Sequence, residues 1–181
     1  MSKPAPLLAP VRPVSTAARL WRNGAFAADA WRTIADDAAI PIDGHAIVSL
    51  QRWRAEQPQL LAKGLPVGIH VEAADTLDPA TDNLDRLAVI ALVFAKFTDG
   101  RAYSTARRLR EQWGYKGELR ATGDVLLDQL PLMLRAGFDA FEIVNAPTIA
   151  ALETAPIPAV RHVYQRSVTT DSSGWRSRRM A

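Results

Sequence analysis

The sequence predicts an α/β domain built on a mainly parallel sheet of about five strands, with an N-terminal β-hairpin. Apolar, β-branched runs alternate with amphipathic helical stretches between residues 46 and 144, and short loops join them, which favours repeated right-handed crossovers. Residues 87–94 (LAVIALVF) are wholly apolar, as is typical of a strand buried on both faces in the middle of a parallel sheet. Whether the sheet is open or a partial barrel does not follow from this pattern.

The strands are placed by turn signals and apolar runs. Asn23-Gly24 favours the positive φ angles of a type I′ turn, so a hairpin is expected there, and its second arm could continue to Trp31 and Ile34. The strands of the parallel sheet are expected at 46–50, 66–71, 87–94, 118–122 and 138–144, with a last strand at 160–164.

Helical stretches are expected between these strands. The first is kinked at Pro58, which lacks an amide donor, and ends near Gly64. The second runs to about Arg86 from Asp78-Pro79, an N-cap followed by a proline at the first helical position. The later segments are 103–113, ended by Gly114; 123–136, capped by Gly123-Asp124, bent at Pro131 and ended by Gly137; and one turn at 149–152.

A single domain is expected over residues 17–165, since 181 residues are enough to bury one substantial core. The prolines of residues 1–16 indicate a flexible leader, and the Ser, Thr and Arg of residues 166–181 indicate a disordered basic tail. Residues 1–20 carry a charge of +3 and residues 161–181 carry +4, so the remaining body carries −4 of the total of +3. An acidic body gives no basic face for duplex nucleic acid. The tail is either solvated or a contact for RNA, lipid or an acidic partner.

Composition excludes several classes of chemistry. The chain has no cysteine, which excludes disulfides, thiolate-bound zinc, Fe–S clusters and a thiol nucleophile, and its three widely spaced histidines do not predict a metal site. It contains no Gly-x-Gly-x-x-Gly, P-loop or Gly-x-Ser-x-Gly motif, so we expect no bound cofactor. No apolar run approaches the roughly 18 residues of a membrane span, and the N-terminus does not resemble a signal peptide. The expected location is the cytoplasm.

Polar residues gather where the strands are expected to end. In parallel α/β folds the carboxyl ends of the strands converge and bind ligands. A helix that begins near residues 98–100 would add unpaired amide groups and the positive end of its dipole. The sequence therefore predicts a small-anion site at this edge. The anion-binding residues expected there are Lys96, Thr98, Asp99, Gly100, Arg101, Ser104 and Arg107, and the candidate catalytic carboxylates are Asp124 and Asp128.

Each of these residues also has a purely structural interpretation. Thr98, Asp99 and Asp124 could be helix caps, and the arginines could form a solvated helix face. Asp124 and Asp128, expected one helical turn apart, could hold Mg²⁺ but also suit a solvated surface. His70 lies in an apolar strand and is interpreted as a core or edge histidine rather than a catalytic one.

Three stretches carry a resemblance to a known family. They are 94–107 (FAKFTDGRAYSTAR), 117–130 (GELRATGDVLLDQL) and 137–141 (GFDAF). Over about residues 17–165 the chain resembles a bacterial family of unknown function whose members are usually described as oxidoreductases involved in sulfite reduction, because their genes lie beside that of the assimilatory sulfite reductase haemoprotein. Pro131 and the Arg-rich tail are atypical of that family. By this resemblance the family's characteristic residues are Lys96, Phe97, Asp99, Gly100, Arg101, Tyr103, Ser104, Arg107, Arg120, Gly123, Asp124, Asp128 and Gln129.

The resemblance implies sulfate assimilation and cysteine biosynthesis as the context and sulfite reductase as the partner, without naming a reaction. The leading hypothesis is an accessory protein in which Lys96, Arg101 and Arg107 bind sulfite, sulfate or a sirohaem carboxylate, oriented by Asp99 and Asp124. One alternative is a small enzyme with Asp124 or Asp128 as general base and Arg101 holding an anionic substrate. Another is a non-catalytic partner subunit that docks the reductase through Trp53 or Trp113. Whether the protein is an enzyme, and whether it forms a homodimer, stays open.

Overall fold

The computed structural model describes residues 18–41, 45–96 and 98–157. The leader expected at 1–16, the last strand expected at 160–164 and the tail expected at 166–181 lie outside these residues. The described part forms one mixed sheet whose strands are β1 (Arg19–Arg22), β2 (Ala25–Ala27), β3 (Trp31–Thr33), β4 (His45–Ser49), β5 (Val67–Val71), β6 (Val89–Phe94), β7 (Glu118–Gly123) and β8 (Ala140–Ile143).

The sheet has eight strands in the order β2-β1-β8-β7-β6-β5-β4-β3. Strands β3 to β8 run parallel, each beside the next along the chain, while β1 pairs antiparallel with both β2 and β8. The expected α/β class and N-terminal hairpin are confirmed, but the sheet has eight strands rather than about five and is mixed rather than mainly parallel. The segment Trp31–Thr33 does not extend the hairpin but forms the opposite edge of the sheet, beside β4.

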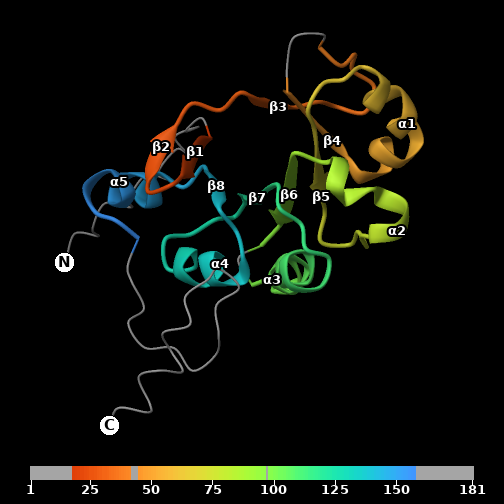
Figure 1. Ribbon diagram of the computed structural model, residues 1–181. Helices are drawn as coiled ribbons and strands as arrows, with labels where there is room; N and C mark the ends of the chain where they lie inside the picture. The colour runs from red at the N-terminus through yellow and green to blue at the C-terminus, as the bar shows by residue number, and fades with distance from the viewer. Residues whose placement is uncertain (1–17, 42–44, 97, 158–181) are drawn as a thin grey trace, which may run out of the picture.

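A short connection shows that the sheet is strongly curled. Strands β2 and β3 are the two edges, yet only Ala28–Ala30 separate them along the chain. Four Cα steps reach at most about 14 Å, whereas eight strands laid flat would place their edges about 34 Å apart. The sheet must therefore bend into a half-barrel, and Figure 1 shows the connection crossing its open side. The question of open sheet or partial barrel is thus resolved as a half-barrel that stays open.

The helices cover the outer face of this half-barrel. Strands that follow one another in space and in sequence place every right-handed crossover on the same side, and Figure 1 shows α1 to α4 outside the arc of strands. The helices are α1 (Leu50–Ala62), α2 (Pro79–Asp82), η1 (Leu84–Arg86), α3 (Arg101–Arg107), η2 (Arg108–Gln112), α4 (Leu130–Ala136) and α5 (Ala146–Thr154). The core lies between these helices and the sheet, and the inner face has no helical layer among the described residues.

Trp53 of α1 is part of this core. Its side chain is 0% exposed, and its indole N–H donates to the Asp82 carbonyl at 2.8 Å. The expectation that Trp53 docks a partner is therefore wrong, because the side chain is already buried against the protein's own elements. Trp113, at the end of η2, is half-buried against the core.

Most helix boundaries follow the predicted caps. Gly64, Gly114 and Gly137 all have positive φ after the helices they end. The Asp78 side chain accepts from the Ala80 amide at 2.9 Å and begins α2. Asn83, at φ 46°, then separates α2 from η1, which breaks the single helix expected up to Arg86.

The helix expected to start at Gly123-Asp124 begins only at Leu130. Pro131 lies in its first turn, where the missing amide costs no hydrogen bond. Extending the helix back to Asp124 would put the proline in its interior and cost about 3 kcal/mol. Residues 124–129 form a bend and a turn instead, so Asp124 and Asp128 do not share a helix face.

Candidate functional site

The carboxyl ends of β6 and β7 meet at one edge of the sheet. Phe94 and Gly123 are register partners, and the Asp124 amide donates to the Phe94 carbonyl at 2.8 Å. Lys96 and Asp124 therefore leave the sheet side by side, Lys96 exposed and Asp124 half-buried. The predicted convergence of these two residues is confirmed at the level of the backbone.

Asp99 and Arg101 form a local ion pair at the start of α3. Arg101 donates from Nε to Asp99 Oδ1 at 3.0 Å and from Nη2 to Oδ2 at 2.6 Å, and its backbone amide donates to Oδ1 at 3.1 Å. These bonds from the Arg101 side chain and backbone lower the pKa of Asp99 to about 2. The Arg101 side chain stays 64% exposed. Asp99 thus stays charged at neutral pH and fixes the plane of an accessible guanidinium.

Among the described residues, the other candidates for anion binding form no ion pair with the Asp99 and Arg101 side chains. Thr98, Gly100 and Ser104 are exposed. Arg107 pairs with Glu111 at 3.3 Å, one turn along the same helical segment. Arg101 also lines a recess of about 20 Å³ beside Glu72 and Asp75, which has room for about one water.

The two candidate catalytic carboxylates differ in surroundings. Asp124 follows β7 directly, whereas Asp128 lies exposed in the turn before α4. Burial, and secondarily the charge of Asp128, raises the pKa of Tyr103. The Tyr103 ring packs edge-on against Phe94 and Phe138, so Asp128 lies close enough to this part of the core for its charge to act on the Tyr103 hydroxyl.

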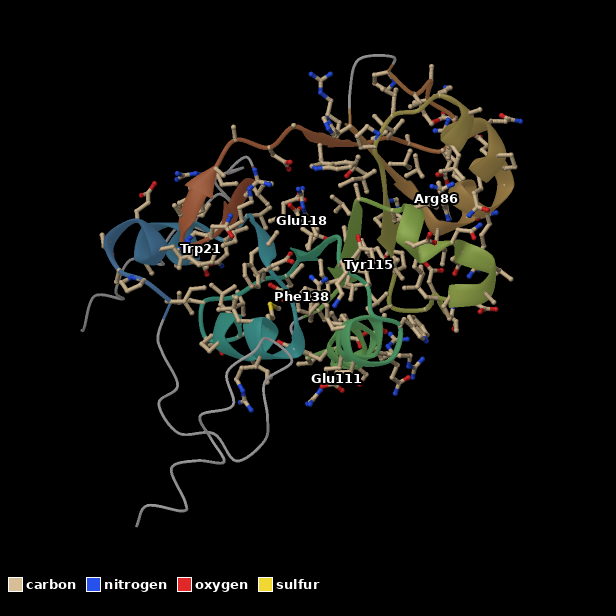
Figure 2. All side chains as sticks on the ribbon, viewed as in Figure 1. Trp21, Arg86, Glu111, Tyr115, Glu118 and Phe138 are labelled. Atoms are coloured by element: carbon tan, nitrogen blue, oxygen red, sulfur yellow. The ribbon has the colours of Figure 1, made fainter. Side chains whose placement is uncertain are left out.

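A buried arginine dominates the inner face of the half-barrel. Arg120 is 1% exposed and donates from Nη1 to Asp29 Oδ2 at 2.6 Å and from Nε to Glu118 Oε1 at 2.8 Å. Burial alone would lower its pKa, but the bonds to these carboxylates raise it. Asp29 belongs to the connection between β2 and β3, so the ion pair fastens that connection across the sheet. Figure 2 shows Glu118 on this inner side, opposite Phe138 and the helices.

An inner cavity of about 200 Å³ lies at the carboxyl half of the same face. Glu142 of β8 stands between this cavity and Arg120, whose Nη1 is 4.0 Å from its Oε2. Burial raises the pKa of Glu142. The side chains that line the cavity are Thr33, Ile47, His70, Glu72, Ala91, Val93, Thr122 and Glu142.

Sequence reasoning did not assign this cavity. His70, interpreted from the sequence as a core or edge histidine, is half-buried and lines the cavity, and its Nδ1 has no hydrogen-bond partner in the part of the chain that the structure describes. The sequence pattern that could have indicated a polar inner face is the alternation in β7, where Glu118, Arg120 and Thr122 occupy every second position. Such a period places all three on one face of a sheet.

A family profile described as "Bacterial protein of unknown function (DUF934)" matches residues 68–175. The chain belongs to this family. The match includes every site residue predicted at the carboxyl edge of the DUF934 sheet, together with His70, Arg120 and Glu142, and leaves out Asp29 and Thr33. No curated protein matches the sequence.

Among residues 18–41, 45–96 and 98–157, every helix is too short or too polar to cross a membrane. Within the same ranges, no three His, Asp or Glu side chains are grouped so that they could hold a metal ion.

Proposed function

We propose that this protein is an accessory protein of assimilatory sulfite reduction that works with the reductase and binds a small oxyanion, sulfite or sulfate. The family resemblance supports the pathway and the partner. The side-on pair of Asp99 and Arg101 at the carboxyl end of β6 carries the proposal of an anion site.

The geometry of this pair supports recognition of an oxyanion. Asp99 occupies the Nε edge of the guanidinium and leaves Nη1 without a hydrogen-bond partner among the described residues. An oxyanion can take two hydrogen bonds from the remaining edge of the fork. Lys96 adds an exposed ammonium at the same edge of the sheet. In this proposal Arg101 holds the anion, Lys96 adds charge, and Asp99 orients Arg101.

Calorimetric titration with sulfite and with sulfate tests the anion site. We expect saturable binding that weakens as salt is raised, and an affinity about tenfold lower in Arg101→Ala, because a charge-assisted fork is lost. Arg86→Ala removes another exposed arginine, in η1 before β6 begins, and should bind like the wild type. Absence of binding by the wild type, or equal binding by Arg101→Ala, would contradict the proposal.

Deletion of the gene tests the pathway separately. We expect the deleted strain to fail on sulfate as sulfur source and to grow on cysteine, since the protein is placed before cysteine is formed. Growth is measured on each source with and without the wild-type gene restored. Normal growth of the deleted strain on sulfate would remove the protein from this pathway, whatever the titrations show.

A further inference from the structure

The inner cavity is separate from the proposed anion site at the start of α3. It lies on the concave face of the half-barrel, at the carboxyl ends of the strands, where α/β barrels place their ligand sites. Its volume of about 200 Å³ has room for about six waters at the density of the liquid. From its position and its charges, we propose that it binds a small organic molecule that carries a protonated amine.

The cavity has two polar walls and an apolar floor. His70 and Glu72 come from the end of β5, and Glu142 comes from β8. Strands β5 and β8 are three positions apart in the sheet, so their backbones are separated by at most about 14 Å. Ala91 and Val93 of β6 form the floor between them. A molecule of a few heavy atoms can therefore contact both walls at once.

The charges around the cavity favour a cation. Arg120 is already bound to Asp29 and Glu118, and its 4.0 Å separation from Glu142 is too long for a hydrogen bond. Among the described residues, the carboxylates of Asp29, Glu72, Glu118 and Glu142 lie around the cavity, and the arginines near them are already paired. Arg22 is paired with Glu118 at 3.3 Å, and Arg101, which lies beside Glu72, is paired with Asp99 at 2.6 Å. An anion would face an excess of carboxylates, whereas an ammonium would give Glu142 a hydrogen-bond donor closer than Arg120, which lies 4.0 Å away.

The remaining polar groups suit the N–H donors of an ammonium. The hydroxyls of Thr33 and Thr122 line the cavity and can accept hydrogen bonds. The His70 Nδ1 is enclosed without a partner in the described part of the chain, so a ligand would contact the rest of the ring. Burial raises the pKa of Glu142, and a bound cation would lower that pKa by stabilising the charged carboxylate.

Three probes with the same four-carbon skeleton test this inference by NMR of the full chain labelled with ¹⁵N. Butylamine is protonated at pH 7, 1-butanol is neutral and butyrate is an anion. We expect butylamine to shift the amide signals of His70, Thr122 and Glu142 and to bind about tenfold or more tightly than either other probe. Equal binding of all three probes, or binding of none, would overturn the inference.

Variants locate the binding within the cavity. Glu142→Gln should weaken butylamine binding about tenfold, because the carboxylate charge is lost. Glu111→Gln, at an exposed carboxylate of η2, should leave binding unchanged. Should Glu142→Gln fail to fold by its amide spectrum, Ala91→Leu fills the cavity from its floor and should abolish binding. Retained butylamine affinity in the folded variant would refute the site. Sulfite titration of the same variants is expected to match the wild type, which separates this inference from the proposed anion site.

Discussion

Arg120→Met is expected to lower the free energy of unfolding by about 3 kcal/mol, because it removes the buried cation from a cluster of partly buried carboxylates. Arg120 is 1% exposed, and Asp29 and Glu118 both depend on it for short hydrogen bonds. Methionine keeps much of the volume, so the loss comes from charge and hydrogen bonding rather than from a cavity. The Asp29 bond also fastens the connection between β2 and β3, so the variant should loosen the open side of the half-barrel.

Urea unfolding followed by tryptophan fluorescence measures this effect. Arg107→Met serves as the control, since Arg107 makes a half-exposed pair with Glu111 and should change stability by no more than about 0.5 kcal/mol. A loss of less than about 1 kcal/mol in Arg120→Met would show that the inner carboxylates do not need the guanidinium. Hydrogen exchange at residues 28–31 should rise in Arg120→Met and not in Arg107→Met.

The strands of the parallel sheet could be predicted because local signals and the final fold agree. Asn23 and Gly24 adopt the positive φ angles that a type I′ turn requires. The strand expected at 66–71 is observed as Val67–Val71, and that expected at 118–122 as Glu118–Gly123. Each depends on residues within a few positions of one another, which a sequence pattern contains.

The curl of the sheet could not be predicted, because it depends on a distant pairing. Nothing in Trp31–Thr33 itself distinguishes a continued hairpin from an edge strand beside β4. The choice is made by the short connection, and by Asp29, which reaches Arg120 ninety-one residues away in sequence. Without the curl, the inner face is not a cavity, and His70 and Glu142 remain polar residues on separate strands.

The site at the carboxyl edge could be predicted in part, because part of it depends on local sequence. Strands joined by one crossover are usually neighbours, and β6 and β7 are neighbours here, which brings Lys96 and Asp124 together. The pairing of Arg101 with Asp99 two residues earlier is also local. The prediction that Asp124 and Asp128 share a helix face was wrong. Pro131 does not bend a helix there but lies in the first turn of α4, which begins at Leu130. A proline near a helix start and one inside a helix look alike in sequence until the cap is known.

Gly123→Ala is expected to destabilise the protein by about 2–5 kcal/mol, from backbone strain and a clash together. Gly123 has φ +86°, and a Cβ there would lie 2.4 Å from the Phe94 carbonyl oxygen. That oxygen accepts the Asp124 amide at 2.8 Å. Because Phe94 and Gly123 are register partners at the end of β6 and β7, the methyl group must part the two strands where the proposed anion site begins.

Gly114→Ala separates the two causes. Gly114 has φ +64° but open space around its Cβ position, so alanine there should cost only the backbone term of about 1–2 kcal/mol. Thermal and urea unfolding of both variants give the difference, which is the contribution of the clash. Equal losses would mean that the ends of β6 and β7 can move apart at no cost. A larger loss in Gly123→Ala, with displaced amide signals at Lys96 and Asp124, would show that the close approach of these strands holds the carboxyl edge in place.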